Sequence, residues 1–510
     1  MSTTTRIAKN TIFLYFRQIL IMLVSLYTVR VVLNVLGAED YGIYNVVAGV
    51  VTMFSFLSGA MATASQRYFS FDLGKGDTEN LKRTFSLTVT IYIILALIVV
   101  ILAETVGLWF VLNKLSVPQE KVEAARWIYQ FSIISFVFTI LTGPFMADII
   151  AHEDMNIYAY VSIVEVLLKL GVAFSLRFFG LDKLILYGLL MLFVTIINTT
   201  IYRAICKKKY PECKYKFCWD KEYVKEMFGF TGWSIFGSFT SMARTQAITV
   251  LVNQFFNPIV VAARTISTQV TNTLNVFSAN FNTSLYAPIV KEWAGGKKQG
   301  MYSLVYTGCK MTFFLMWIFA LPLCLRMEYV LTLWLKNLPE YVIIFTILSI
   351  IEVQINAISY PIMTAARASG KVKLYELTLG IMQLLMFIAS YVWLKFFNGG
   401  PTAVFWTAII LNIAMFFARL LIVRHLVQLS LRQFAVKVIL PILILISVSF
   451  LPSYILNKYL LQTFWALVIV VFVSLLLSGF TMYFVGLNKE WREKIKNMIR
   501  QKLHIGVKND

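Results

Sequence analysis

The stretch NTIFLYFRQILIMLVSLYTVRVVLNVLGAEDYG (residues 10–42) decides the fold of this chain. Its apolar run, residues 12–36, is long enough to cross a bilayer as a helix, yet it contains Arg17 and Arg30. A guanidinium near the bilayer centre costs about 2.5–3.5 kcal/mol on insertion scales, and it cannot lose its charge. We therefore expect such arginines to face a protein interior or a watery cavity, where several of them together can bind an anion.

The whole chain has the composition of a multi-pass membrane protein, because 59% of its 510 residues are hydrophobic and only 14% are charged. Its apolar runs are each long enough to cross the hydrocarbon layer and predict fourteen transmembrane helices, hence an all-α integral membrane fold. The expected spans are 12–36, 44–66, 85–110, 127–150, 158–178, 184–205, 229–254, 262–286, 303–325, 341–364, 375–397, 402–423, 434–454 and 461–485.

Positive charge sets the predicted orientation. An even number of spans places both termini on one side, and Lys and Arg are concentrated in the central loop and the tail that lie on that side. This excess predicts that both termini are cytoplasmic. The net charge of +21 would also fit nucleic-acid binding, but the basic residues fall in short segments between apolar runs, and we find no nucleic-acid-binding motif.

The two halves of the chain repeat one another. Gly74-Lys75-Gly76 after the second span has a counterpart in Gly295-Gly296-Lys297 after the eighth, and other short matches recur in the same order. Because each half holds six spans, the halves have the same orientation and form parallel repeats. We expect an N-terminal six-helix lobe (1–205), a basic cytoplasmic linker (206–227), a C-terminal six-helix lobe (228–425), two further helices (426–487) and a basic cytoplasmic tail (488–510).

Two more arginines lie in the apolar runs that open the second half. Arg244 falls in the middle of the span 229–254, and Arg264 begins the span 262–286. Arg30 and Arg244 are the favoured anion ligands. Arg17 and Arg264 can bind the same anion or can instead lie at the membrane interface, because a long arginine side chain reaches back to the headgroups.

The span 262–286 has an unusual polar face. Polar side chains recur along it at helical intervals of three, four and seven residues. Lipid does not tolerate such a face, so the face lines a water-filled cavity or forms hydrogen bonds to neighbouring helices. The residues expected to face a cavity and to bind sugar are Thr268, Gln269, Asn272, Asn275 and Asn282.

Three residues are candidates for ion coupling. Glu165 lies four residues before Lys169, so the two share one helix face and can form an ion pair that is either structural or titratable. Glu352 stands alone in the span 341–364, and a buried lone carboxyl group can carry a proton.

The sequence contains no sign of catalysis. It lacks a nucleophile elbow, a phosphate-binding loop, a zinc signature and paired carboxylates in the outside loops, so we expect no catalytic residue, cofactor or metal. Cys213 and Cys218 could ligate a metal, but no matching Cys/His pair lies near them in the sequence. The odd number of cysteines, five, favours free thiols.

The N-terminal motif resembles a known family. Asn10–Arg17 followed by Val29–Gly42, with Gly37-Ala38-Glu39-Asp40-Tyr41-Gly42 after Arg30, is similar to the Wzx-type polysaccharide flippases of the multidrug/oligosaccharidyl-lipid/polysaccharide exporter superfamily. The resemblance covers the whole chain through the number of helices and the two-lobe repeat. Beyond the first 80 residues it rests on this pattern more than on motifs.

The resemblance implies two six-helix lobes in a V around a central cavity. It implies transport of an undecaprenyl-pyrophosphate-linked oligosaccharide, such as an O-antigen repeat unit, from the inner to the outer leaflet by alternating access, driven by an ion gradient or the membrane potential. Arg30 corresponds to the family's helix 1 arginine, Asp40 to the acidic residue of the following turn, and Arg264 to an arginine of the second lobe. The span 44–66 lacks a central arginine, since Arg67 lies at its end, which argues against lipid II as the substrate.

The resemblance also implies a location and partners. A flippase of this kind lies in the bacterial inner membrane, among membrane lipids, and works with the polymerase and other assembly proteins of polysaccharide or lipopolysaccharide synthesis. Two alternatives stay open at this point. One is a cation-coupled multidrug exporter of the same superfamily, and the other is a membrane polysaccharide polymerase or glycosyltransferase.

Overall fold

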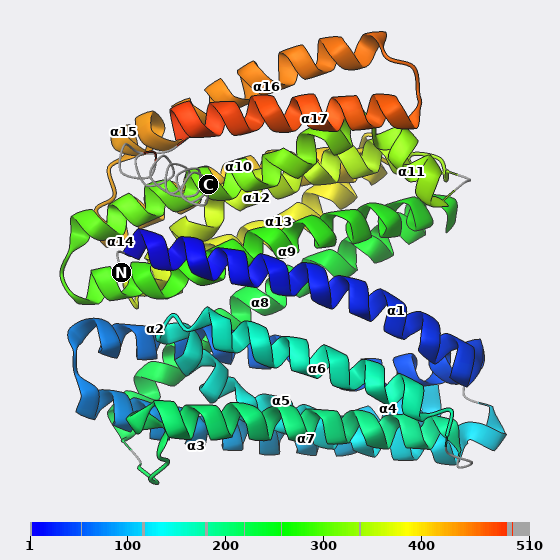
Figure 1. Ribbon diagram of the computed structural model, residues 1–510, viewed down its shortest axis with the longest axis vertical. Coiled ribbons are helices and arrows are strands. Elements are labelled where there is room, and N and C mark those ends of the chain that lie inside the picture. The colour runs from blue at the N-terminus through cyan, green and yellow to red at the C-terminus, as the bar shows by residue number, and fades with distance from the viewer. Residues whose placement is uncertain are drawn as a thin grey trace, which may run out of the picture. The chain divides into compact units, whose positions relative to one another are not determined.

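The computed structural model describes residues 3–52, 54–114, 118–178, 182–218, 220–256, 258–335, 338–486 and 492. These residues form helices and contain no strand, as Figure 1 shows, so the all-α prediction is confirmed. The basic tail predicted at 488–510 lies outside the described residues, apart from Arg492.

The first half of the chain forms seven α-helices with short helical segments between them. Their bounds are α1 (Thr3–Thr52), α2 (Ser55–Lys75), α3 (Thr78–Leu102), η1 (Ala103–Gly107), α4 (Leu108–Lys114), η2 (Gln119–Lys121), α5 (Val122–Ala151), α6 (Met155–Ser175), α7 (Lys183–Lys209) and η3 (Pro211–Cys213).

The second half begins with two long helices. The bounds are α8 (Lys221–Phe255), α9 (Pro258–Ala294), α10 (Lys298–Leu325), α11 (Met327–Leu335), α12 (Val342–Ala368), α13 (Lys373–Phe396), α14 (Ala403–Val427), α15 (Leu431–Phe434), η4 (Ala435–Ile439), α16 (Leu440–Tyr459), α17 (Phe464–Thr481) and η5 (Met482–Gly486). The segments η4 and η5 are π-helical.

Most of the predicted spans coincide with helices that can cross a membrane. Within the described residues, eleven helices are long and apolar enough, or twelve when Ile43–Thr52 and Leu57–Lys75, which meet at a bend of 47°, count as one span. The predicted spans 229–254 and 262–286 coincide with α8 and α9, which are 35 and 37 residues long but are not among these helices. The protein is therefore a multi-pass membrane protein, but the count of fourteen spans is not confirmed.

The motif in residues 37–42 makes the turn between the first two spans. α1 kinks at Gly37, whose φ of 84° and ψ of 167° are accessible to glycine and strained for other residues. Three residues later, the Asp40 carboxylate forms a 3.0 Å ion pair with Lys121 in η2. Asp40 thus has a structural partner that attaches this turn to the segment before α5.

The chain folds into two compact units. The N-terminal unit comprises Thr5–Phe239 and Val290–Lys297, and the C-terminal unit comprises Met1–Thr4, Thr240–Ile289 and Lys298–Asp510. The boundaries fall inside α8 and inside α9, whereas the predicted linker 206–227 belongs to the N-terminal unit. The division into two six-helix lobes stays a prediction.

In the N-terminal unit, α5 packs against α2, α3, α6 and α7, and Figure 1 shows α3, α5 and α7 running alongside one another. In its core the Phe69 ring stacks on the Phe85 ring, and the Phe85 ring meets the Phe145 ring edge to face. The expected linker packs on this unit, because Tyr210 and Cys213 are buried. All five cysteines are free, as predicted.

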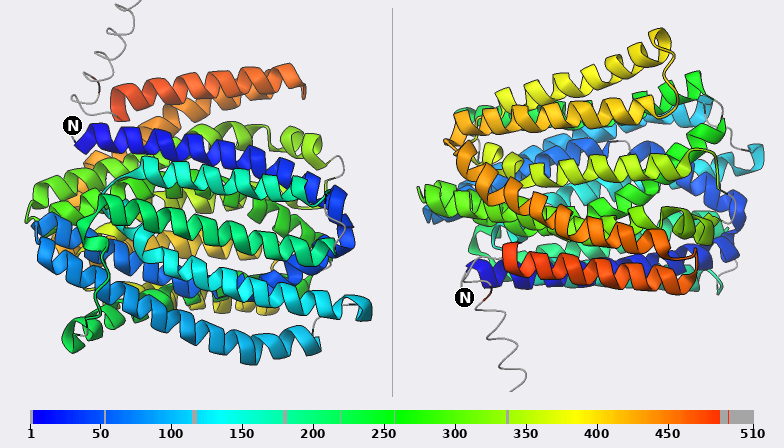
Figure 2. Two further views of the ribbon diagram at one scale, coloured as in Figure 1. Left: turned by 60° about the horizontal axis from the view of Figure 1, so that its bottom comes forward. Right: turned by 90° about the horizontal axis from the view of Figure 1, so that it is seen from above.

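In the C-terminal unit, α12 packs against α10 and α14, and α13 packs against α14. The rings of Phe345 and Phe405 stack between α12 and α14 at a centroid distance of 4.4 Å. The last two long helices, α16 and α17, form a pair that packs on α10, and Figure 2 shows this pair from two further sides.

The two repeated glycine motifs meet within the N-terminal unit. At the end of α2, a Cβ added to Gly74 would lie 2.7 Å from the Lys291 Cα and 2.9 Å from the Ala294 Cβ at the end of α9. The Lys291 ammonium forms a 2.9 Å ion pair with Glu153. Glycine at position 74 therefore permits close backbone contact between α2 and the end of α9.

We expect Gly74→Ala to weaken this contact. Overpacking against a backbone costs about 1–3 kcal/mol, which exceeds the gain of about 1 kcal/mol from replacing a helical glycine by alanine. Gly59→Ala in the same helix is the matched control, because nothing lies within 4 Å of an added Cβ there. Thermal unfolding of the detergent-solubilised protein should show a lower midpoint for Gly74→Ala and an unchanged or higher one for Gly59→Ala. Equal midpoints for the two variants would contradict the close contact.

Candidate functional site

Helices of the C-terminal unit bring three of the predicted site residues together around Glu352. The Glu352 carboxylate of α12 accepts a 3.0 Å hydrogen bond from the Arg244 guanidinium of α8 and a 2.9 Å hydrogen bond from Asn412 of α14. Arg244 and Glu352 are about four-fifths buried. The sequence did not pair these two residues, which are 108 positions apart.

Arg264 of α9 joins the same cluster. Its guanidinium lies over the Phe405 ring, 5.9 Å from the ring centroid, and interacts electrostatically with both Glu352 and Arg244. Two permanently charged guanidiniums therefore share one carboxylate. The two guanidiniums and the one carboxylate give the cluster a net positive charge. The excess charge can bind an anion.

The polar face of α9 continues from Arg264 along the helix. Thr268 donates its hydroxyl hydrogen to the Arg264 carbonyl at 2.9 Å, and Asn282 donates to the Ser278 carbonyl at 2.8 Å. Gln269 and Asn272 are exposed, Asn275 is half-buried, and all three side chains lack a hydrogen bond to any described residue. These three amides remain available to a polar ligand.

Arg30 and Arg17 differ although both lie in the first span. Arg30 is exposed on the N-terminal unit and forms no ion pair or hydrogen bond with the part of the chain that the structure describes. Arg17 is only 7% exposed. Its guanidinium lies 4.5 Å from the centroid of the Tyr158 ring and donates to the Ser162 hydroxyl at 3.5 Å. Arg17 thus contributes to the packing of α1 on α6, which leaves Arg30 as the accessible cation.

The predicted pair of Glu165 and Lys169 forms on α6, at 2.6 Å. Asn198 of α7 donates a 3.0 Å hydrogen bond to the second oxygen of Glu165. The pair attaches α6 to α7. About a third of each charged side chain is exposed, so a titratable role stays a prediction.

Sequence reasoning missed two residues of α14. Asn412 completes the hydrogen bonds of Glu352, and Arg419 donates to Asn356 of α12 at 3.4 Å. Arg419 carries the same signal as the four predicted arginines, since it is a charge inside the apolar run 402–423. Asn412 carries no comparable signal, because one amide in an apolar helix is common.

The comparison with family models identifies the family of this chain. Residues 7–293, more than half of the chain, match the family model described as polysaccharide biosynthesis protein, and the chain belongs to that family. The search of the curated proteins found no match to this sequence.

Solved structures show the fold. A multidrug resistance MATE family transporter of the MOP superfamily, in an outward-facing conformation, has a TM-score of 0.73 and 13% identity, over 84% of this chain and 96% of its own. The Vibrio cholerae MATE transporter VcmN in its bent form has a TM-score of 0.66 and 15% identity, over 86% and 100%. The MATE transporter ClbM in complex with Rb⁺ has a TM-score of 0.64 and 14% identity, over 86% and 97%.

Family and fold thus agree with the resemblance to Wzx-type flippases. The chain has the fold of MATE transporters, one of which is described as a member of the MOP superfamily, and it belongs to the polysaccharide biosynthesis family. The identities are too low for the solved structures to assign a substrate.

We expect the charges around Glu352 to be energetically coupled. Glu352→Met leaves two neighbouring guanidiniums without a counter-ion, whereas Arg244→Met leaves Glu352 with Arg264 and Asn412. Each single substitution should destabilise the protein by about 1–3 kcal/mol, Glu352→Met more than Arg244→Met. The double variant should be more stable than the sum of the single effects predicts, because it leaves one guanidinium, that of Arg264, without a counter-ion where Glu352→Met leaves two. Additive shifts of the thermal midpoint would mean that the ion pair contributes nothing.

Proposed function

We propose that the protein transports an undecaprenyl-pyrophosphate-linked oligosaccharide, a polysaccharide repeat unit, from the inner to the outer leaflet of the membrane. The family and the fold support a transporter involved in polysaccharide synthesis. The observation that carries the choice of substrate is the cluster of Arg244, Arg264 and Glu352, with its excess of positive charge.

A pyrophosphate fits this cluster chemically. Arginine binds phosphate oxygens through charge-assisted, often bidentate hydrogen bonds. Arg244 already presents one such bond to the Glu352 carboxylate, and its Nε has no hydrogen-bond partner among the described residues. A phosphate that reached this site would either replace the Glu352 carboxylate as the partner of Arg244 or bind Arg244 together with it.

Competition between phosphate and Glu352 supplies a way to couple transport to protons. An ionised Glu352 repels the phosphate and holds Arg244. A protonated Glu352 does neither, so protonation and binding of the pyrophosphate favour each other through linkage. A proton gradient would then set the direction in which substrate is released.

Polar side chains of the protein can also bind the sugars of the substrate. Sugar hydroxyls suit the free amides of Gln269, Asn272 and Asn275 on α9. In the N-terminal unit, Arg30 offers a further guanidinium that no described residue occupies. Alternating access, in which a fixed site opens to each side in turn, is the mechanism that this fold supports best.

The proposal includes a setting. The positive residues of the central loop support a topology with both termini in the cytoplasm, and we propose that the protein lies in the bacterial inner membrane. In this proposal a polymerase and other assembly proteins act on the repeat unit after its transfer.

We expect Arg30→Ala and Arg244→Ala each to abolish surface polysaccharide in cells that depend on this protein. Arg30→Lys and Arg244→Lys should retain part of the activity, because lysine keeps the charge but not the bidentate geometry. The measurement is the amount of surface polysaccharide at equal protein levels in the membrane.

Glu352→Gln provides the internal control for the charge. The substitution keeps the shape of the side chain and removes the negative charge that competes with the phosphate. Substrate should therefore bind at least as well as in the wild type, and transport should lose its dependence on a pH gradient. Normal polysaccharide in both alanine variants would refute an anion site formed by these arginines.

A second candidate function is a cation-coupled multidrug exporter. The likeness to MATE transporters favours it, and the partly exposed Glu165 offers a carboxylate for a cationic substrate. The positive charge around Arg244 and Arg264 favours the anionic substrate instead. Export of cationic drugs that is lost in Glu165→Gln and kept in Arg244→Ala would identify the exporter.

A further inference from the structure

Three potential metal ligands converge at the end of α5. Asp148 lies in the last turn of α5, His152 caps that helix, and Glu212 lies in η3, in the segment that the sequence predicted to be a linker. One ligand atom from each residue lies within 4.8 Å of the other two. His152 Nε2 is 2.6 Å from the Glu212 carboxylate and 3.9 Å from the Asp148 carboxylate.

The spacing of these atoms suits a zinc ion after a small adjustment. Zinc binds nitrogen and carboxylate oxygen at about 2.0–2.2 Å, so tetrahedral donors lie about 3.3–3.6 Å apart. The hydrogen bond between His152 and Glu212 is shorter than this, and the separation of His152 from Asp148 is slightly longer. A movement of well under 1 Å in each would admit the metal.

An ion pair between His152 and Glu212 alone does not explain why the carboxylate of Asp148 is buried beside them. The Asp148 side chain is fully buried, and its Oδ1 has no hydrogen-bond partner among the described residues. A buried carboxylate oxygen without a partner is costly. A dication held between Asp148, Glu212 and a neutral imidazole would satisfy that oxygen and balance both carboxylates.

Further contacts complete the site. Cys213 Sγ, which is buried, donates a hydrogen bond of 3.2 Å to the second oxygen of Asp148 and so holds that carboxylate in place. The Tyr210 ring stacks on the imidazole of His152 at 4.3 Å and holds its orientation. Such outer contacts are typical of metal sites.

We propose that Asp148, His152 and Glu212 bind one divalent transition-metal ion, and that zinc fits best. A histidine nitrogen and two carboxylates are donors that zinc uses, and a water molecule can complete its tetrahedral coordination. The ion would attach the segment after α7 to the end of α5. This proposal is independent of the transported substrate.

The test uses the full-length protein, purified with a tag that contains no histidine, stripped with a chelator and titrated with Zn²⁺. We expect stoichiometric zinc by elemental analysis and a zinc-dependent rise of the thermal midpoint. His152→Gln and Glu212→Gln should each weaken binding by about 100-fold or more. His425→Gln, which changes an exposed histidine of α14, is the matched control and should bind zinc normally.

Two outcomes would overturn the metal site. One is wild-type protein that binds no stoichiometric zinc. The other is a His152→Gln variant that loses the same stability with and without zinc, since this is what a purely structural ion pair predicts.

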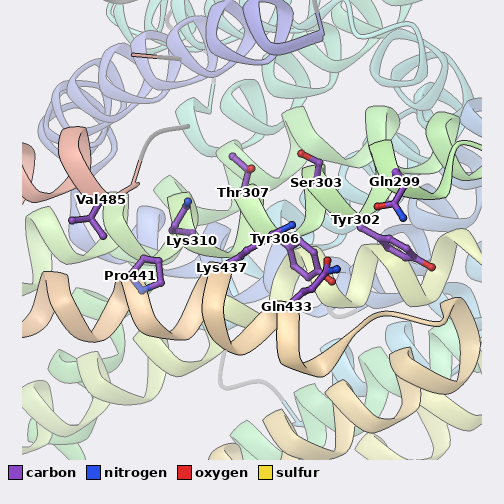
Figure 3. A pocket seen from close by; sticks show the side chains of 10 residues that line it. All are labelled: Gln299, Tyr302, Ser303, Tyr306, Thr307, Lys310, Gln433, Lys437, Pro441 and Val485. Carbon is purple, nitrogen blue, oxygen red and sulfur yellow. The ribbon is translucent and has the colours of Figure 1, made fainter. Parts of the chain in front are cut away.

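A different observation concerns a pocket in the C-terminal unit. A cavity of about 370 Å³ lies between α10 on one side and α15, η4 and the start of α16 on the other. Figure 3 shows Lys437 of η4 reaching Tyr306 of α10, with Lys310 lining the cavity from the same helix, α10. Among the described residues that line the cavity, two are lysines and none is acidic.

The charge of Lys310 has no counter-ion within the part of the chain that the structure describes. Lys310 is 6% exposed and forms neither an ion pair nor a hydrogen bond with the described residues. Arg492 lies near enough to repel it electrostatically. Lys437 is held over the Tyr306 ring, 5.5 Å from the ring centroid. A buried ammonium without a counter-ion is costly, so the pocket is built for an anion.

The surroundings indicate which anion. Val436, Leu440 and Leu443 are exposed beside Lys437, although they are large and apolar. Acyl chains can cover these side chains while a phosphate reaches the two ammonium groups. We infer that the pocket binds the phosphate of an anionic phospholipid headgroup.

Lipid binding to the purified full-length protein tests this inference. Phosphatidylglycerol should bind more tightly than phosphatidylcholine by native mass spectrometry. Lys310→Gln and Lys437→Gln should weaken it by about tenfold each, as the loss of one charge-assisted contact predicts. Lys458→Gln, at the far end of α16, is the control and should have no effect. Displacement of the lipid by inorganic phosphate alone, or equal affinity for the two lipids, would overturn the lipid site.

Discussion

The cost of a charge in an apolar environment is the constraint on which this structure depends. Hydrocarbon cannot solvate a guanidinium or an open backbone group, so the chain forms helices throughout its described residues and gives most of its inserted charges a partner. Arg17 is covered by Tyr158, Arg244 is paired with Glu352, and Lys169 is paired with Glu165. Each of these partners lies on another turn or another helix. Where the partner lies on another helix, the pairing of the charge also fixes how the two helices pack.

The charges that lack such a partner are the informative ones. Among the described residues, Arg30 and the buried Lys310 have no counter-ion, and Arg264 shares a carboxylate that Arg244 already holds. An unpaired cation in an apolar helix does not stabilise the protein, because burying a charge without a partner is costly. An anionic ligand would supply the missing charge, and this is the reason for proposing a phosphorylated substrate at Arg244 and Arg264 and a phospholipid at Lys310.

The same reasoning from sequence succeeded or failed for identifiable reasons. The ion pair of Glu165 and Lys169 could be predicted, because a separation of four residues places both on one helix face. The pairing of Arg244 with Glu352 could not, because it depends on which of many helices meet. Likewise, the sequence gives no reason to group Asp148 and His152 with Glu212, because the 60 positions between His152 and Glu212 hide the fact that the fold brings them together.

The sequence by itself determined the class of fold, the positions of nearly all membrane-crossing helices and the presence of cations inside them, because hydropathy and charge are properties of single segments. It also carried the family, through the motif at Arg30 and Gly37-Ala38-Glu39-Asp40. Only the tertiary structure decided which cations are neutralised, that Asp40 is held by Lys121, and that Asp148, His152 and Glu212 share one place. These facts depend on distances between helices, and a distance between helices is set by the packing of the whole unit rather than by any one segment.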